Sequence, residues 1–168
     1  MLQIGTVAPD TLELLKKLQS ISDLSDTRLV GGTALAFHLG HRLSIDLDLF
    51  GNFEQETITE TLKSESFNSF SVLKESKFMK DIAAMKIAAI TNRGSRKDFI
   101  DLFFLLKIFD LADILEFYQS KYFDANTFFA IRSLSYFVDA EKDEMPKMLI
   151  PTSWEDVKEK IIAEVRKI

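Results

Sequence analysis

The chain has 168 residues, 46% of them apolar and 28% charged, which suits one domain with its own core and excludes a disordered protein. No cysteine is present, so disulfides and thiolate chemistry are excluded and a cytoplasmic protein is expected. No apolar run could cross a membrane, no secretory signal pattern opens the chain, and a net charge of −5 argues against nonspecific coating of nucleic acid.

The first predicted element is a helix over residues 8–21. Asp10 is placed to cap it, and Glu13 follows three residues later, which is the spacing of a capping box. Leucines at 14, 15 and 18 recur at helical spacing and predict one buried stripe.

A short strand is predicted over residues 27–32, followed by a helix over 33–40 that Gly40 closes. Gly31 and Gly32 end the strand, and the helix starts near Thr33. Glycines let the backbone approach a phosphate closely, and a helix N-terminus offers free N–H groups and a positive dipole end. These residues are therefore candidates for nucleotide binding, although a plain turn is the simpler interpretation of Gly-Gly.

A second strand is predicted over residues 43–50, where apolar residues alternate with polar ones. The alternation places Asp46 and Asp48 side by side on one face, with Leu47 and Leu49 on the core side. Two neighbouring carboxylates repel unless a cation lies between them, and Mg²⁺ prefers such oxygen ligands. The pair is a candidate metal site, against the simpler interpretation of a solvated strand face. Arg42 could pair with one aspartate.

The remaining pattern predicts a polar helix, a third strand and then a mostly helical half. The ranges are 54–65 for the polar helix, 67–73 for the strand, 81–91, 98–110, 112–122, 126–140 and 153–168 for further helices, and 144–153 for a loop. Phe99, Leu102 and Leu106 belong to a core stripe, and Ser153 with Asp156 forms a capping pair. We therefore predict an α/β (α+β) fold with a core over 1–80 and a helical C-terminal region over 81–168, forming one compact unit.

Three charged residues interrupt apolar helices of the second half. Lys86 divides two apolar segments of its helix, and Asp98 and Asp101 share one side of the next helix. A structural ion pair between Lys86 and Asp98 is one interpretation, and a phosphate-contacting lysine oriented by Asp98 is the other. Residues 74–97 also carry seven basic residues against two acidic ones, which could face a phosphate-bearing ligand or solvent.

The segments GGTALAFHLGHRLSIDLDLF, DIAAMKIAAITNRGSRKDFIDLFFLL and YFVDAEKDEMPKMLIPTSWEDVK together resemble the AbiEii/AbiGii toxin-like nucleotidyltransferases. These belong to the polymerase-β-like nucleotidyltransferase superfamily. The resemblance implies a small mixed palm-like sheet with a helical C-terminal region. It also implies Mg²⁺-dependent transfer of a nucleotide from an NTP to an acceptor hydroxyl, with RNA as a candidate acceptor, in a toxin–antitoxin or phage-defence system with an antitoxin partner.

Carried over by position, Gly32 and Thr33 match the start of the nucleotide motif, and Asp46 and Asp48 match the metal-binding pair. Lys86 and Asp98 match the lysine and aspartate of the helical motif, and Asp101 is the second carboxylate there. The chain resembles a shortened member, because residues 67–80 hold no apolar-Asp-apolar pattern for a third carboxylate.

Three hypotheses remain open from the sequence. The first is an active nucleotidyltransferase. The second is a catalytically degenerate domain that binds nucleotide or a partner protein without turnover. The third is a helical interaction protein in which the aspartates are structural, so that Mg²⁺ and NTP would leave the thermal midpoint unchanged.

Overall fold

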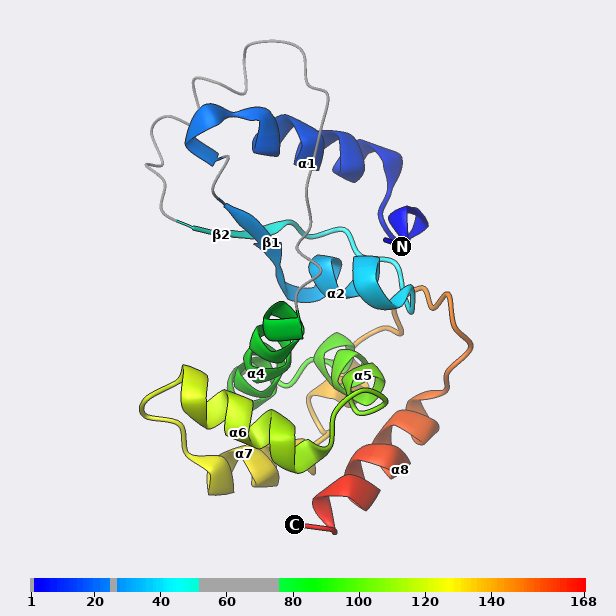
Figure 1. The fold of residues 1–168 in the computed structure, drawn as a ribbon. Coiled ribbons are helices and arrows are strands. Elements are labelled where there is room, and N and C mark those ends of the chain that lie inside the picture. Colours follow the sequence, from blue (N-terminus) through cyan, green and yellow to red (C-terminus); the bar gives the residue numbers. More distant parts are fainter. Residues whose placement is uncertain (1, 25–26, 52–75) are drawn as a thin grey trace. The chain divides into compact units, whose positions relative to one another are not determined.

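The computed structural model describes residues 2–24, 27–51 and 76–168 (Figure 1). The chain divides into two compact units, Met1–Lys74 and Glu75–Ile168, and each is described here by itself. The helix expected at 54–65 and the strand expected at 67–73 lie outside the described residues. The boundary expected between residues 80 and 81 stays a prediction.

The first unit contains helices, two short strands and single 3-10 turns. Its described elements are η1 (Ile4–Thr6), α1 (Pro9–Ser20), η2 (Ser22–Leu24), β1 (Arg28–Val30), α2 (Gly31–Leu39) and β2 (Asp48–Phe50). Helix α2 packs against β1, β2 and η1. Together with the helical second unit, this confirms the predicted α/β class with a small sheet.

Helix α1 begins earlier than the predicted cap. Its N-cap is Ala8 and Pro9 is its first residue, so the prediction that Asp10 caps the helix is wrong. Proline is favoured at the first helical position because its φ is already helical and an N–H there would have no partner. The prediction of a buried leucine stripe is also wrong at Leu14, which is 42% exposed, whereas Leu15 is fully buried.

Strands β1 and β2 pair antiparallel, with Leu29 opposite Leu49 and Val30 opposite Asp48. The predicted strand over 43–50 is therefore too long, since only its last three residues are in the ladder. Ile45 is 74% exposed, so the predicted alternation fails there. Because β1 is three residues long, it offers backbone partners to no more than a short segment.

Helix α2 starts two residues before the predicted start, at Gly31, so both glycines belong to its first turn. It ends as predicted at Gly40, whose φ of 66° is in the left-handed region that glycine adopts without steric cost. Five consecutive residues of α2, from Thr33 to Phe37, are buried. Helix α2 is thus the core helix of the first unit.

The second unit is helical in all its regular elements that the structure describes. They are α4 (Ser76–Asn92), α5 (Arg96–Leu105), α6 (Leu111–Lys121), α7 (Thr127–Leu134), η3 (Ala140–Lys142) and α8 (Trp154–Val165). Helix α4 packs against α5, α6 and α7, and α8 packs against α5 and α7. The predicted helices are confirmed in position, but those expected over 98–110 and 126–140 end at Leu105 and Leu134.

Three aromatic rings join α5, α8 and the segment after α7. The ring of Phe99 lies 4.9 Å from that of Phe137 and 6.0 Å from that of Trp154, centroid to centroid. The predicted capping box is confirmed: Ser153 accepts from the Asp156 backbone, and the Asp156 side chain accepts from the Ser153 backbone. In the ranges the structure covers, no helix is both long and apolar enough to cross a bilayer.

Replacing Phe99 with alanine should destabilise the second unit by about 3–5 kcal/mol, because it leaves a cavity beside two aromatic rings. Phe123→Ala is the matched control, since that ring is 102% exposed and should cost about 0.5 kcal/mol or less. Urea denaturation measures both. Equal midpoints for the two variants would contradict the proposed core.

Candidate functional site

In the first unit, the sheet places Asp48 beside the start of α2. Val30 pairs with Asp48, and Gly31 follows Val30 directly. Gly31 has a φ of +70°, and a Cβ at this position would lie 3.1 Å from Asp48 Cγ. The Asp48 carboxylate thus fills the space that a side chain at position 31 would need.

A hydroxyl group joins the same helix turn to the segment that carries Asp46. Thr33 is fully buried, and its hydroxyl donates to the backbone carbonyl of Asp46. Its Oγ1 also lies 2.8 Å from the Ser44 hydroxyl oxygen. The sequence did not identify Ser44 as a partner, because its polar side chain was explained by strand alternation alone. These contacts hold the aspartate segment against the N-terminus of α2.

Both aspartates of the predicted metal site are exposed. Asp48 lies in β2, but Asp46 precedes it, so the argument that one strand aligns the two side chains is wrong. What brings the two aspartates near α2 is the Thr33 hydrogen bond on one side and the Val30 pairing on the other. Their exposed oxygens form a donor set that suits Mg²⁺, which binds one or two carboxylates and completes its shell with water and phosphate.

Arg42 is 4% exposed, and its Nη1 donates to the Leu43 carbonyl at 3.0 Å. Gly32 is half-buried in the first turn of α2. Among the described residues, no three histidine or acidic side chains form a metal-binding group. The contacts of Thr33 and Gly31 place Asp46 and Asp48 at the first turn of α2, which also contains Gly32. The roles expected of these residues stay a prediction.

In the second unit, a buried charge cluster joins α4 to α5. The Lys86 ammonium lies 3.1 Å from Asp98 Oδ1 and 2.7 Å from Asp101 Oδ2. The Lys86 side chain is 5% exposed, and both carboxylates are fully buried. The ion pair expected between Lys86 and Asp98 is thus present, and Asp101 belongs to it as well.

Two further residues satisfy the Asp98 carboxylate. Arg93 donates to it from Nε at 2.7 Å and from Nη2 at 3.0 Å, and the Ser95 hydroxyl donates at 2.6 Å. The sequence did not single out either residue for this contact. The turn that brings both residues to Asp98 contains Gly94, whose φ of +56° lets the chain fold back between α4 and α5.

The pKa of Asp98 lies below its ordinary value of 3.8. Burial is the largest influence and raises the pKa, but hydrogen bonds from Arg93 and Ser95 and the charge of Lys86 together outweigh it. The carboxylate is therefore ionised at neutral pH. Together with Asp101 it neutralises the two cations of the cluster.

Comparisons with known proteins identify the family of the chain. Residues 13–75 match the family model described as nucleotidyl transferase AbiEii toxin, type IV TA system. The chain is also 30% identical to an uncharacterised protein of Aquifex aeolicus, in an alignment 197 residues long. The alignment covers 88% of this chain and 90% of that protein. No solved structure matches significantly. The chain belongs to the AbiEii nucleotidyltransferase toxin family, as a shortened member, and the matched range contains the whole site of the first unit.

The low pKa of Asp98 predicts acid sensitivity. A carboxyl group whose pKa is lower in the folded protein stabilises the fold at pH values above its unfolded-state pKa of 3.8. This contribution is lost as the pH falls through the folded-state pKa. Wild type should therefore lose more stability than Asp98→Asn between about pH 5 and pH 2. Asp139→Asn, at an exposed pair with Lys142, is the control and should behave like wild type. Parallel urea midpoints for Asp98→Asn and wild type across this range would contradict the assignment.

Gly31→Ala should destabilise the first unit by about 1–2 kcal/mol through its left-handed φ alone, and more if Asp48 must move. Gly5→Ala is the matched control, because nothing lies within 4 Å of a Cβ there. Thermal unfolding of the two variants measures the difference. A stable Gly31→Ala protein with unchanged Asp48 environment would rule out the close approach.

Proposed function

We propose that this protein is an Mg²⁺-dependent nucleotidyltransferase of a toxin–antitoxin or phage-defence system. It transfers a nucleotide from an NTP to an acceptor hydroxyl, for which RNA is the candidate, and an antitoxin protein is its expected partner. The coarser assignment rests on family membership. The metal, the nucleotide, the acceptor and a cytoplasmic location are parts of the proposal.

One observation carries the proposal: the first turn of α2 and the Asp46–Asp48 segment meet in a single place. The backbone N–H groups of a helix N-terminus attract phosphate, and exposed carboxylates hold the cation that accompanies a triphosphate. Gly31 and Gly32 add no side chain of their own to this approach, and the Asp48 carboxylate lies directly beside Gly31.

Each residue has a defined task in this mechanism. Asp46 and Asp48 would hold Mg²⁺, which neutralises phosphate charge and orients the triphosphate when it is bound. The backbone N–H groups of Gly31, Gly32 and the rest of the α2 N-terminus would bind phosphate oxygens. Thr33 keeps the aspartate segment in place through its hydrogen bond to the Asp46 carbonyl. The rate enhancement would come from positioning and electrostatic stabilisation, as in phosphoryl transfer generally.

The charge cluster of the second unit has a structural role in this proposal. The geometry favours the ion-pair interpretation for Lys86, because its ammonium is buried between Asp98 and Asp101. A contact of Lys86 with phosphate stays a prediction. Arg93 is the member of the cluster that reaches solvent, with 57% of its side chain exposed.

Asp46→Asn and Asp48→Asn should each lower nucleotide transfer by at least about 100-fold, because the neutral amide lacks the negative charge that holds the cation. Asp10→Asn, an exposed acid in the first turn of α1, should transfer like wild type. The assay combines equilibrium binding of each NTP, with and without Mg²⁺, and transfer of labelled nucleotide to RNA.

The same assay separates the remaining hypotheses. Mg²⁺-dependent binding without turnover by wild type would contradict the proposed transfer and match a degenerate nucleotide-binding domain. No binding and no shift of the thermal midpoint would match the interaction-protein hypothesis. Full activity in both aspartate variants would remove the proposed site.

A further inference from the structure

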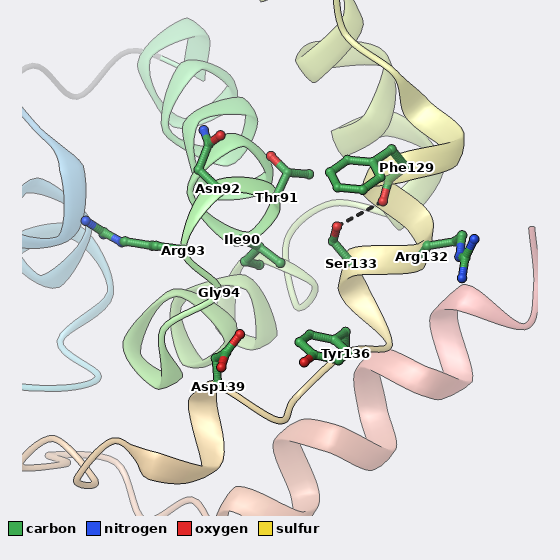
Figure 2. Close-up of a pocket in the computed structure, with 10 residues that line it drawn as sticks. All are labelled: Ile90, Thr91, Asn92, Arg93, Gly94, Phe129, Arg132, Ser133, Tyr136 and Asp139. Carbon is green, nitrogen blue, oxygen red and sulfur yellow. Dashed lines mark hydrogen bonds between the residues drawn. The ribbon is translucent and has the colours of Figure 1, made fainter.

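The helical unit carries two adjoining cavities that the proposed function does not use. One of about 440 Å³ lies between the end of α4 and α7 (Figure 2), and another of about 490 Å³ lies between α4 and the α6–α7 connection. Both are lined by Thr91, Asn92 and Phe129. The two cavities therefore adjoin and share part of their lining, and we call them together the aromatic groove.

One face of α7 and the residues after it supply the first half of the groove. Phe129, Arg132, Ser133 and Tyr136 recur at the three- and four-residue spacing that aligns side chains on a helix. The rings of Phe129 and Tyr136 are each 55% exposed. Figure 2 shows these rings on either side of Ser133, whose hydroxyl donates to the Phe129 carbonyl at 3.0 Å.

The second half continues with more aromatic side chains. The Tyr118 and Tyr122 rings lie 5.4 Å apart, centroid to centroid, and both line the second cavity. Phe123, at the end of α6, lines it as well and is fully exposed. Tyr118 is buried, so the large rings that the groove leaves in water are those of Phe123, Phe129 and Tyr136, and exposed rings of this kind mark a binding surface.

The polar groups of the groove are amide, hydroxyl and guanidinium groups, together with the Lys121 ammonium and the Asp124 carboxylate. Asn92 uses one N–H to bond the Ala88 carbonyl at 2.9 Å, which leaves its other amide valences for a ligand. Within the part of the chain that the structure describes, Arg132 makes no ion pair. Asp139 also lines the groove, but Lys142 at 3.1 Å offsets its charge.

We propose that the aromatic groove binds unpaired bases of a single-stranded nucleic acid, with Phe129 and Tyr136 stacking on bases and Arg132 contacting a phosphate. Base stacking on exposed aromatic rings, combined with an arginine, is how proteins hold single strands without strong sequence preference. Each cavity alone falls in the range of about 300–1,000 Å³ that holds one small ligand. Two adjoining cavities therefore favour connected nucleotides over a free mononucleotide.

The idea that the bound strand is the acceptor of nucleotide transfer rests on the proposed function. As a binding site the groove can be tested without transfer. The probe is a fluorescently labelled oligouridylate of about six nucleotides, a length within the site sizes of known single-strand binders. Binding is followed by anisotropy in EDTA, without NTP or Mg²⁺, and UMP and an RNA duplex are used as competitors.

Phe129→Ala and Tyr136→Ala should each weaken oligouridylate binding by at least about fivefold. Phe128→Ala is the matched control, since that ring is 72% exposed on the same helix but does not line the groove. Arg132→Gln should reduce the slope of log affinity against log salt by about 0.7, the value for one phosphate contact on a single strand. Thermal midpoints verify that all variants fold.

Three results would overturn the inference. They are no binding by wild type, equal binding by the Phe129, Tyr136 and Phe128 variants, and UMP binding as tightly as the oligonucleotide. In the first case the exposed rings would be left for a protein partner. Asp48→Asn should bind the oligonucleotide like wild type, so failure of transfer and failure of the groove give different results.

Discussion

Three buried charged side chains meet between α4 and α5, and a fourth, partly exposed one joins them from the turn. Lys86 spans Asp98 and Asp101, while Arg93 returns from the α4–α5 turn to close on Asp98. Each of the three buried charges, on Lys86, Asp98 and Asp101, is tolerated only because opposite charges neutralise it, since an unpaired buried ion costs several kcal/mol. The cluster therefore fixes the register of α4 against α5, and α4 in turn supports α6 and α7.

The first unit is constrained by the backbone instead. Gly31 turns the chain from β1 into α2 with a positive φ, and the Asp48 carboxylate lies where a side chain would otherwise be. The groups that we propose to bind metal and phosphate need positions that do not depend on flexible side chains. A strand pair, a helix turn and the buried Thr33 hydroxyl provide such positions with only a short stretch of chain, which is the stretch that carries the family signature.

The sequence predicted the helical unit better than the sheet, for a physical reason. Phe99 and Leu102 repeat at helical spacing, and helix hydrogen bonds are local, so the pattern is nearly sufficient. A strand needs a partner, and the alternation from residue 43 to 50 could not reveal that β1 pairs with three residues only. At the site, the glycines and aspartates were predictable by type and order. Ser44, Arg93 and Ser95 were not, because their roles depend on contacts that no local pattern encodes.

The distribution of tryptophan and tyrosine along the chain has a consequence for spectroscopy. Trp154 is the single tryptophan, and all three tyrosines, at 118, 122 and 136, also belong to the second unit. The first unit absorbs in the near ultraviolet only through phenylalanine. Intrinsic fluorescence and 280 nm absorbance therefore come from the second unit alone. Neither signal reports directly on the unfolding of the first unit. A tryptophan introduced there would let the two units be followed in one protein.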